Sequence, residues 1–359
     1  MSSRLTIECI DQIEGFAELK GEWSQLASAR ASPLMSHAWF YCAAKTLHTR
    51  DRLWIVVARR GGRISGVAPL VQVRRGANVW LELIGARHLC EPSGLPAEDP
   101  DSLMELCSAI ASKRLPVALQ RVDPSSNVLS AFRKAGRWRG ITVRVRSAST
   151  LWVATDKEWP GIQSKISARR RADLRRARRA LETIGPVRIE CLRPGPEAVT
   201  AALDSAFEIE AASWKSRAGT AVVCREPMRR FFEEMSRSFA TSGNLEVRFL
   251  HAGDECVAMQ LGLEYGNRWW DLKIGYDEAY AKASPGMQLT AGGLMLASER
   301  RLASHEFLGS PADWERRWAS GERSLESVIF YPFSAHGACA IAIDLYEYCM
   351  RAFKKIQRE

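Results

Sequence analysis

The stretch that decides the fold is Arg268-Trp269-Trp270-Asp271-Leu272-Lys273-Ile274-Gly275-Tyr276, then Asp277-Glu278-Ala279-Tyr280-Ala281-Lys282-Ala283, then Ser284-Pro285-Gly286-Met287-Gln288-Leu289. Aromatic and β-branched residues fill its first part, so residues 269–276 are predicted to form a strand. A helix is predicted to begin at Ser284 and to end near Arg301. Ser284 is a preferred N-cap residue, and Pro285 fits the first helical position.

The start of this predicted helix is a candidate phosphate site. Gly286 leaves room for a ligand to approach the backbone. The free N–H groups of the first turn carry the positive end of the helix dipole, and this arrangement binds phosphate. An ordinary capped helix without a ligand has the same local signature, so the surrounding chain has to distinguish the two.

Short motifs on both sides of this helix follow one another in a fixed order between about Leu203 and Ala319. They are Trp214-Lys215-Ser216-Arg217-Ala218-Gly219, Phe231-Phe232, Phe239-Ala240, Val257-Ala258, Gly275-Tyr276-Asp277, Tyr280-Ala281, Ser284-Pro285-Gly286 with Leu289, Glu306-Phe307-Leu308-Gly309 and Arg316-Arg317-Trp318. The ordered set resembles the acetyltransferase-like domain of the bacterial CelD/BcsL family of cellulose and exopolysaccharide biosynthesis proteins. That family belongs to the GNAT acyltransferase superfamily and is related to the FemABX peptidyltransferases.

The resemblance implies that an acyl group moves from acetyl-CoA, or another acyl-CoA, to an amine by direct attack in a ternary complex. It implies a phosphate cradle formed by Ser284, Pro285, Gly286, Met287, Gln288 and Leu289. The pantetheine arm would lie along the preceding strand, where backbone N–H groups near Ile274, Gly275 and Tyr276 would hold the thioester carbonyl. Tyr276 is the first candidate for the acid that protonates the departing thiolate, ahead of Tyr280.

A general base is expected among the carboxylates near these motifs. Phe207 and Trp214 share the buried face of a helix predicted over residues 198–217. Glu210 lies on the same face, and Glu208 lies at its edge. Because a carboxylate on a buried face is costly unless it is paired or used, Glu210 is the first candidate for the base.

Asp271 is the second candidate for the base. It lies two residues from Lys273, so strand alternation places both side chains on one face, where an ion pair between them is the alternative role. Residues expected to bind the acceptor are Trp214, Lys215, Arg217, Lys273, Trp314 and Arg317. Family members often carry Tyr-Lys before Arg-Arg-Trp, whereas Trp314-Glu315 stands here, which reverses a charge at the expected substrate wall.

The positive charge of the chain is concentrated in one segment. The chain has 359 residues and a net charge of +10, and residues Lys165–Arg179 contain eight Lys/Arg against Asp173. This segment belongs to a helix predicted over residues 162–181 with almost no apolar stripe. It is a candidate site for an anionic ligand, and a solvated basic face is the alternative.

Cysteine and histidine spacing indicates neither a metal site nor a disulfide framework. The nine cysteines are scattered singly without a CxxC pair, and the six histidines show no ligand spacing. No apolar run reaches the roughly 18 residues of a membrane helix, and the N-terminus lacks the apolar core of a signal peptide. We therefore expect a cytoplasmic protein with no bound metal and no transmembrane segment.

Helices and strands alternate along the chain, which predicts an α/β (α+β) protein. The resemblance implies two tandem GNAT-like domains, each a mixed sheet flanked by helices. The expected domains are residues 1–150 and residues 151–335, the second carrying the basic helix 162–181. Residues 147–160 are expected to be a crossing segment. Residues 336–359 are expected to form an amphipathic helix that packs on the second domain.

Three functions remain open at this stage. The first is an acyl-CoA-dependent N-acyltransferase that acts on an amino sugar or on an exopolysaccharide or cell-envelope precursor. The second is a FemABX-like peptidyltransferase that uses aminoacyl-tRNA, with the basic helix holding RNA. The third is a non-enzymatic protein that binds nucleic acid or another anionic polymer through the basic helix.

Overall fold

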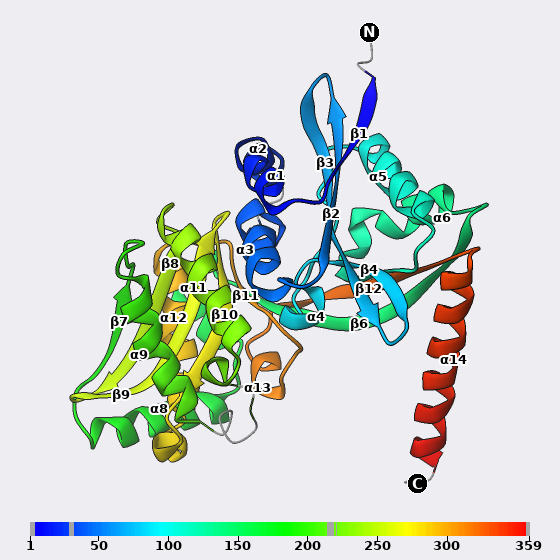
Figure 1. Ribbon diagram of the computed structural model, residues 1–359. Coiled ribbons are helices and arrows are strands. Elements are labelled where there is room, and N and C mark those ends of the chain that lie inside the picture. Colours follow the sequence, from blue (N-terminus) through cyan, green and yellow to red (C-terminus); the bar gives the residue numbers. More distant parts are fainter. Residues whose placement is uncertain (1–3, 29–31, 214–218, 220, 357–359) are drawn as a thin grey trace. The chain divides into compact units, whose positions relative to one another are not determined.

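The computed structural model describes residues 4–28, 32–213, 219 and 221–356, with side chains up to residue 350 (Figure 1). The chain divides into two compact units, residues 1–30, 34–148 and 324–359 in the first and residues 31–33 and 149–323 in the second. The main boundaries fall inside two long strands, β6 (Gly140–Ala154) and β12 (Gly321–Pro332). Residues 147–154, expected to be part of a crossing segment, are therefore the second half of a strand.

The first unit is built on a mixed sheet with the strand order β1-β2-β3-β4-β5-β12. All neighbouring pairs are antiparallel except β4 and β5. The strands that precede β12 are β1 (Leu5–Ile10), β2 (Arg52–Arg60), β3 (Arg63–Arg75), β4 (Asn78–Leu83) and β5 (Val117–Val122). The helices are α1 (Ile13–Glu18), α2 (Lys20–Ser28), α3 (His37–Leu47), α4 (Ala86–Leu89), α5 (Pro100–Ser112), α6 (Val128–Ala135) and α14 (Ala335–Ile356), with 3-10 turns η1 (Pro33–Met35) and η2 (Pro124–Ser126).

The last helix, α14, belongs to the first unit. Its start is fixed to β4, because Asn78 Nδ2 donates a hydrogen bond to the carbonyl of His336 (2.9 Å). The expectation that this helix packs on the second domain is therefore wrong, because β12 carries the chain back into the first sheet before α14 begins. Among the described residues, no helix has both the length and the apolar character needed to cross a membrane.

The second unit is also built on a mixed sheet, with the strand order β6-β11-β10-β9-β8-β7. Only β10 and β11 are parallel neighbours. The strands that follow β6 are β7 (Val187–Leu192), β8 (Leu245–Ala252), β9 (Glu255–Tyr265), β10 (Arg268–Tyr276) and β11 (Ser304–Phe307). The helices are α7 (Trp159–Ser164), α8 (Ala168–Glu182), α9 (Val199–Ala211), α11 (Glu226–Ala240), α12 (Pro285–Glu299) and α13 (Asp313–Arg316), with 3-10 turns η3 (Val222–Cys224) and η4 (Glu278–Ala283).

The predicted fold class is confirmed, because each unit is a mixed sheet flanked by helices (Figure 1). In the second unit α9 and α11 pack on one face of the sheet and α12 on the other. α8 packs against α12, where Ile166 and Leu174 join the apolar cluster that includes Leu294 and Phe307. These few apolar positions are enough to dock a helix whose other side chains are mostly charged.

A buried ion-pair network fixes α12 to its sheet. Arg248 on β8 is fully buried; its Nε donates to Glu246 Oε1 (2.7 Å) and its Nη1 to Gln260 Oε1 (3.2 Å). The guanidinium also lies 3.5 Å from the ring centroid of Trp269. Arg300, which follows α12, donates to Glu246 Oε2 (2.6 Å). The network thus joins three strands to the end of α12.

Gly293 allows α12 to approach this network. A Cβ at position 293 would lie 2.8 Å from Nη1 of Arg248 and 3.0 Å from Oε1 of Gln260. Any larger residue would push the helix away from a buried charge that has no room to move. The position of α12 is therefore set by a polar contact as well as by its apolar face.

The charge of Glu246 contributes to stability in a pH-dependent way. Burial alone would raise the pKa of this carboxyl, but the charges and hydrogen bonds of Arg248 and Arg300 outweigh it and hold the pKa below its ordinary value of 4.5. A carboxyl whose pKa is depressed by folding contributes stability above its unfolded pKa. That contribution is lost as the pH falls through the folded pKa.

Glu246→Gln keeps the shape of this side chain and removes its charge. We expect the variant to lose about 3 kcal/mol or more of unfolding free energy at pH 7, the cost of breaking a buried ion pair. The difference from wild type should shrink as the pH falls below the ordinary carboxyl pKa of 4.5, because the unfolded wild-type chain then binds a proton at Glu246, and it should vanish once the pH is below the lower folded pKa. Urea unfolding at pH 7 and pH 3.5 measures both values, and a difference that does not change with pH would contradict the prediction.

Candidate functional site

The parallel pairing of β10 with β11 is short, because β11 ends at Phe307 while β10 continues. Their parallel register pairs residues 268–271 with residues 304–307 and ends there. β10 continues to Tyr276 and stays paired with β9 on its other side. The edge of β10 that faces β11 is therefore not covered by that strand beyond Asp271, and the chain then leads through η4 into α12.

A β-bulge at Leu272 reverses the side-chain alternation of β10, because the register with β9 shifts between Asp271 and Lys273. Asp271 lies on the α12 face, where Gln260 Nε2 donates to its Oδ2 (2.7 Å). Lys273 lies on the opposite face, with Nζ 5.3 Å from the ring centroid of Phe232 on α11. The prediction that Asp271 and Lys273 share a face is therefore wrong, because one inserted residue moves every later side chain to the other face.

The bulge also turns Gly275 toward α9. A Cβ at Gly275 would lie 2.9 Å from Cα and 3.1 Å from Cβ of Glu210, so glycine permits the close approach of helix and strand. Glu210 is 1% exposed, and its Oε2 accepts a hydrogen bond from the N–H of Val222 (3.1 Å). Glu208, which helical spacing predicts at the edge of the buried face, is exposed. The first candidate base thus lies against the backbone segment expected to hold the thioester carbonyl.

α12 begins differently from the sequence-based prediction. Its N-cap, Ser284, has φ 47° and ψ 53°, in the left-handed region, and the side chain makes no capping hydrogen bond. The prediction that the Ser284 side chain caps the helix is wrong, because such a cap needs an extended backbone at the N-cap. Gly286 lies beside Tyr276, and a Cβ there would be 3.4 Å from the tyrosine ring, which is an ordinary contact.

The remaining residues of the expected cradle divide between the surface and the core. Pro285 and Leu289 are buried, so their side chains serve packing. Met287 and Gln288 are partly exposed. Gln288 Nε2 donates to the carbonyl of Leu174 on α8 (2.7 Å). The basic helix is therefore joined to the first turn of α12.

Asp271, the second candidate base, is buried among polar groups. Its Oδ2 accepts from Gln260 and lies 3.4 Å from Nε2 of His305. Within the described part of the chain, Asp271 Oδ1 and His305 Nδ1 have no hydrogen-bond partner. Burial lowers the pKa of His305 although Asp271 opposes the change, so the imidazole is neutral at pH 7. Asp271 and Glu210 lie on opposite faces of the sheet, so the structure does not bring the two candidates together.

Trp314 and Glu315, singled out in the sequence as a departure from the expected family pattern, both make contacts within the second unit. Trp314 packs edge-on against Phe307, with ring centroids 5.8 Å apart. Glu315 Oε2 accepts a hydrogen bond from the N–H of Ala312 (2.8 Å). Burial, reinforced by the charge of Asp271 and opposed by that hydrogen bond, raises the pKa of Glu315 to about 7. The burial that shifts this pKa comes from the fold and could not be predicted from the sequence.

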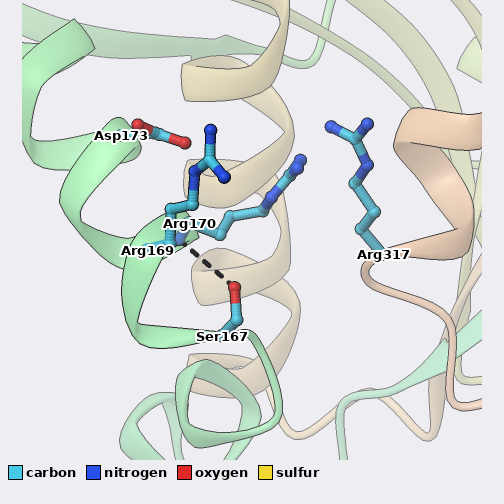
Figure 2. A pocket seen from close by; sticks show the side chains of 5 residues that line it. All are labelled: Ser167, Arg169, Arg170, Asp173 and Arg317. Carbon is cyan, nitrogen blue, oxygen red and sulfur yellow. Dashed lines mark hydrogen bonds between the residues drawn. The ribbon is translucent and has the colours of Figure 1, made fainter.

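An open pocket of about 430 Å³ lies at the start of α8 (Figure 2). It is lined by Ser167, Arg169, Arg170, Asp173 and Arg317. Figure 2 shows the two neighbouring arginines extending from α8, and Arg317 extending from the segment that follows α13, on the other side of the space. Arg317, expected from the sequence to bind the acceptor, therefore lies with the basic helix.

Three further acceptor candidates, Trp214, Lys215 and Arg217, lie outside the described residues. Lys273 faces α11, and Trp314 packs beside the end of β11. Over the ranges that the structure describes, no group of three His, Cys, Asp or Glu side chains is arranged to hold a metal ion.

Residues 168–316 match the family model described as an acetyltransferase (GNAT) domain. The match begins at α8 and ends at α13, so it contains β10 and β11, α9 with Glu210, and α12. The second unit therefore contains the whole region that is similar to a GNAT acetyltransferase domain. No curated protein matches the chain.

Several solved structures share the fold over most of the chain at low sequence identity. FemX is 12% identical, with 91% of this chain and 97% of FemX covered and a TM-score of 0.59. The C-terminal domain of a putative lysylphosphatidylglycerol synthetase from Agrobacterium fabrum is 10% identical, with 92% and 96% covered and a TM-score of 0.57. L-PGS from Bacillus licheniformis is 11% identical, with 88% and 90% covered and a TM-score of 0.52. At these identities the similarity establishes the fold alone.

Two glycines of the site should respond differently to an added methyl group. Gly275→Ala is expected to lower the free energy of unfolding by about 1–3 kcal/mol, because Cβ would overlap the backbone of α9 at Glu210. Gly286→Ala should change it by no more than about 1 kcal/mol, because Cβ has room there and alanine favours a helix. Urea unfolding of the two variants tests the contact, and equal effects would contradict it.

Proposed function

We propose that this protein is an acyl-CoA-dependent N-acyltransferase that acts on an amino sugar or on an exopolysaccharide or cell-envelope precursor. One observation carries the proposal: the register of β10 with β11 ends at Asp271 and Phe307, while β10 continues to Tyr276 and leads to α12. A strand edge without its parallel neighbour, followed by a helix start, suits a long thioester that ends in phosphates. The GNAT match over residues 168–316 supports the acyl-transfer class.

In this proposal the donor is acetyl-CoA or another acyl-CoA, bound as a substrate. The pantetheine arm lies along β10 between Leu272 and Tyr276. The pyrophosphate lies at the first turn of α12, where the backbone N–H groups of Gly286 and Met287 precede the first internal helical bonds. Gly286 fits this role, since among the described residues a Cβ added there would have Tyr276 alone within 4 Å.

The chemistry is a direct transfer. The acceptor nitrogen attacks the thioester carbonyl carbon, and the developing oxyanion is held by backbone N–H groups near Ile274–Tyr276. Glu210 accepts the proton that the amine loses. The carbon–sulfur bond then breaks, and the thiolate of coenzyme A takes a proton from Tyr276. An amide and free coenzyme A are the products, with atoms and charge balanced.

Glu210 is the preferred base because of its place. It is buried, its Cα and Cβ lie against Gly275, and the N–H of Val222 fixes one carboxylate oxygen. Asp271 lies on the α12 face, where Gln260 and His305 hold it. A base must reach the attacking amine, so its position relative to the carbonyl-binding segment is decisive.

The acceptor class rests on the sequence resemblance to CelD/BcsL proteins, whose pathways build exopolysaccharides. The exchange of lysine for Glu315 beside the end of β11 indicates that the acceptor differs from those of relatives with lysine. A carboxyl group with a pKa of about 7 can attract an ammonium group in its ionised form. This suits an acceptor that arrives as a protonated amine and releases one proton to water before its nitrogen attacks the thioester.

A FemABX-like transfer of an amino acid from aminoacyl-tRNA is the second candidate function. It is favoured by the fold similarity to FemX and by the exposed arginines of α8, which include Arg175, Arg176 and Arg179. These side chains would contact phosphates of the RNA backbone. tRNA binding that falls steeply with salt, and less steeply after alanine replacement of these arginines, would support this candidate or a non-enzymatic nucleic-acid binder.

Glu210→Gln tests the proposed base, with Glu208→Gln as the matched control on the same helix. We expect turnover of acetyl-CoA with amino-sugar acceptors to fall at least about tenfold in Glu210→Gln, with little change in acetyl-CoA affinity. Glu208→Gln should keep wild-type turnover, because the Glu208 side chain is exposed and lies at the edge of the buried face of α9. Release of the free thiol measures turnover between pH 6 and pH 9.

Wild-type turnover of Glu210→Gln across that pH range would remove Glu210 from the mechanism and transfer the role to Asp271 or water. Release of no thiol from any acyl-CoA, together with consumption of aminoacyl-tRNA, would contradict the proposed function and select the FemABX-like reaction.

A further inference from the structure

The arginine pocket at the start of α8 contains positive charge that the described residues do not neutralise. Arg169 and Arg170 come from α8, and Arg317 comes from the segment after α13 (Figure 2). Within the described ranges none of these three guanidinium groups forms an ion pair. The one carboxylate that lines the pocket, Asp173, accepts a hydrogen bond from Arg176 (2.9 Å). Asp173 thus offsets part of the charge of the three arginines, and an excess of positive charge remains among the residues that line the pocket.

Like charges held this close repel one another. Burial, and then the charge of Arg317, lowers the pKa of Arg170. Arginine remains protonated at every physiological pH, so the repulsion is not relieved by loss of a proton. Two separate chain segments nevertheless bring their guanidinium groups to one space of about 430 Å³. An anion in that space would remove the repulsion and satisfy donors from both segments.

The pocket lies close to the expected donor site. Leu174, the residue after Asp173, accepts the hydrogen bond from Gln288 in the first turn of α12. Arg170 precedes Leu174 by about 6 Å along the helix axis, at ~1.5 Å per residue. Ile166 and Leu174 share an apolar cluster with Met287, so α8 rests directly on the first turns of α12. A ligand that reaches α12 is therefore within reach of the arginines.

We propose that Arg169, Arg170 and Arg317 form a binding site for a phosphoryl group carried by one of the two substrates. Planar guanidinium groups donate paired hydrogen bonds to the oxygens of phosphate, and three of them match a group that carries two negative charges. The source of the phosphate is either the 3′-phosphate of coenzyme A or the phosphate of a nucleotide-linked amino sugar. The identity of the substrate rests on the proposed function, whereas the binding of phosphate does not.

Inorganic pyrophosphate is the probe for the site itself. Arg170→Ala/Arg317→Ala removes two charges that line the pocket, and Arg175→Ala/Arg179→Ala removes two charges from the same helix that do not. Calorimetric titration at low salt should show pyrophosphate bound at least about tenfold more weakly by the pocket variant, and with near wild-type affinity by the control. Arg170→Lys/Arg317→Lys should bind with intermediate affinity, because charge is kept and the paired donors are lost.

Calorimetric titrations with coenzyme A, 3′-dephospho-coenzyme A and UDP-glucosamine then identify the substrate that carries the phosphoryl group. If the pocket binds the donor, the pocket variant loses affinity for coenzyme A and not for the dephospho form. If it binds the acceptor, the loss appears with UDP-glucosamine. Either pattern supports the site. Circular dichroism of each variant confirms that the helix is intact.

Equal loss of pyrophosphate affinity in the pocket variant and the control would overturn the proposal, because it would assign binding to the general charge of α8. Unchanged affinity in the pocket variant would overturn it as well. Neither outcome would contradict the proposed acyl transfer, because that proposal is tested separately by thiol release from acyl-CoA.

Discussion

The β-bulge at Leu272 is the constraint on which the rest of the site depends. Without it, Gly275 would face α12 together with Asp271, and the close contact between Glu210 and the strand would not exist. With it, β10 presents Asp271 to the buried polar network on one face and Gly275 to α9 on the other. A single inserted residue thereby places the two candidate bases, Asp271 and Glu210, on opposite faces of the sheet.

The network around Arg248 fixes the position of α12, whose first turn is the expected phosphate-binding part of the site. The side chains of Arg248 and Gln260 lie directly under Gly293 of α12. Arg300, which follows α12, donates a hydrogen bond to Glu246 on β8. α12 is thus fixed along its length, while its first turn contacts α8 through Gln288. A rigid helix start favours binding and catalysis, because backbone donors that are already in position need no free energy to reorganise during the reaction.

Much of the fold follows from the sequence, and the failures have local causes. Helical spacing correctly predicts that Glu210 lies on the buried face, with Glu208 at the edge of that face, because a long periodic pattern averages over many contacts. The bulge at Leu272 is invisible to strand alternation, so Asp271 and Lys273 were expected on one face. The left-handed backbone at Ser284 and the docking of α14 depend on tertiary packing. Tertiary folding brings Arg317 to the pocket at the start of α8, and the sequence does not predict this. The sequence does not predict the burial of Glu315 either.

The central claim is that the end of β10 and the start of α12 together bind an acyl-CoA. Thermal unfolding with acetyl-CoA, compared with the same concentration of ADP, tests it most directly, since a ligand that binds the folded state must stabilise it. The account predicts a larger rise in melting temperature with acetyl-CoA than with ADP. It also predicts that Gly286→Glu, which places bulk and negative charge at the cradle, remains folded and loses that rise. Equal shifts with both ligands, or an unchanged acetyl-CoA shift in folded Gly286→Glu, would contradict the claim.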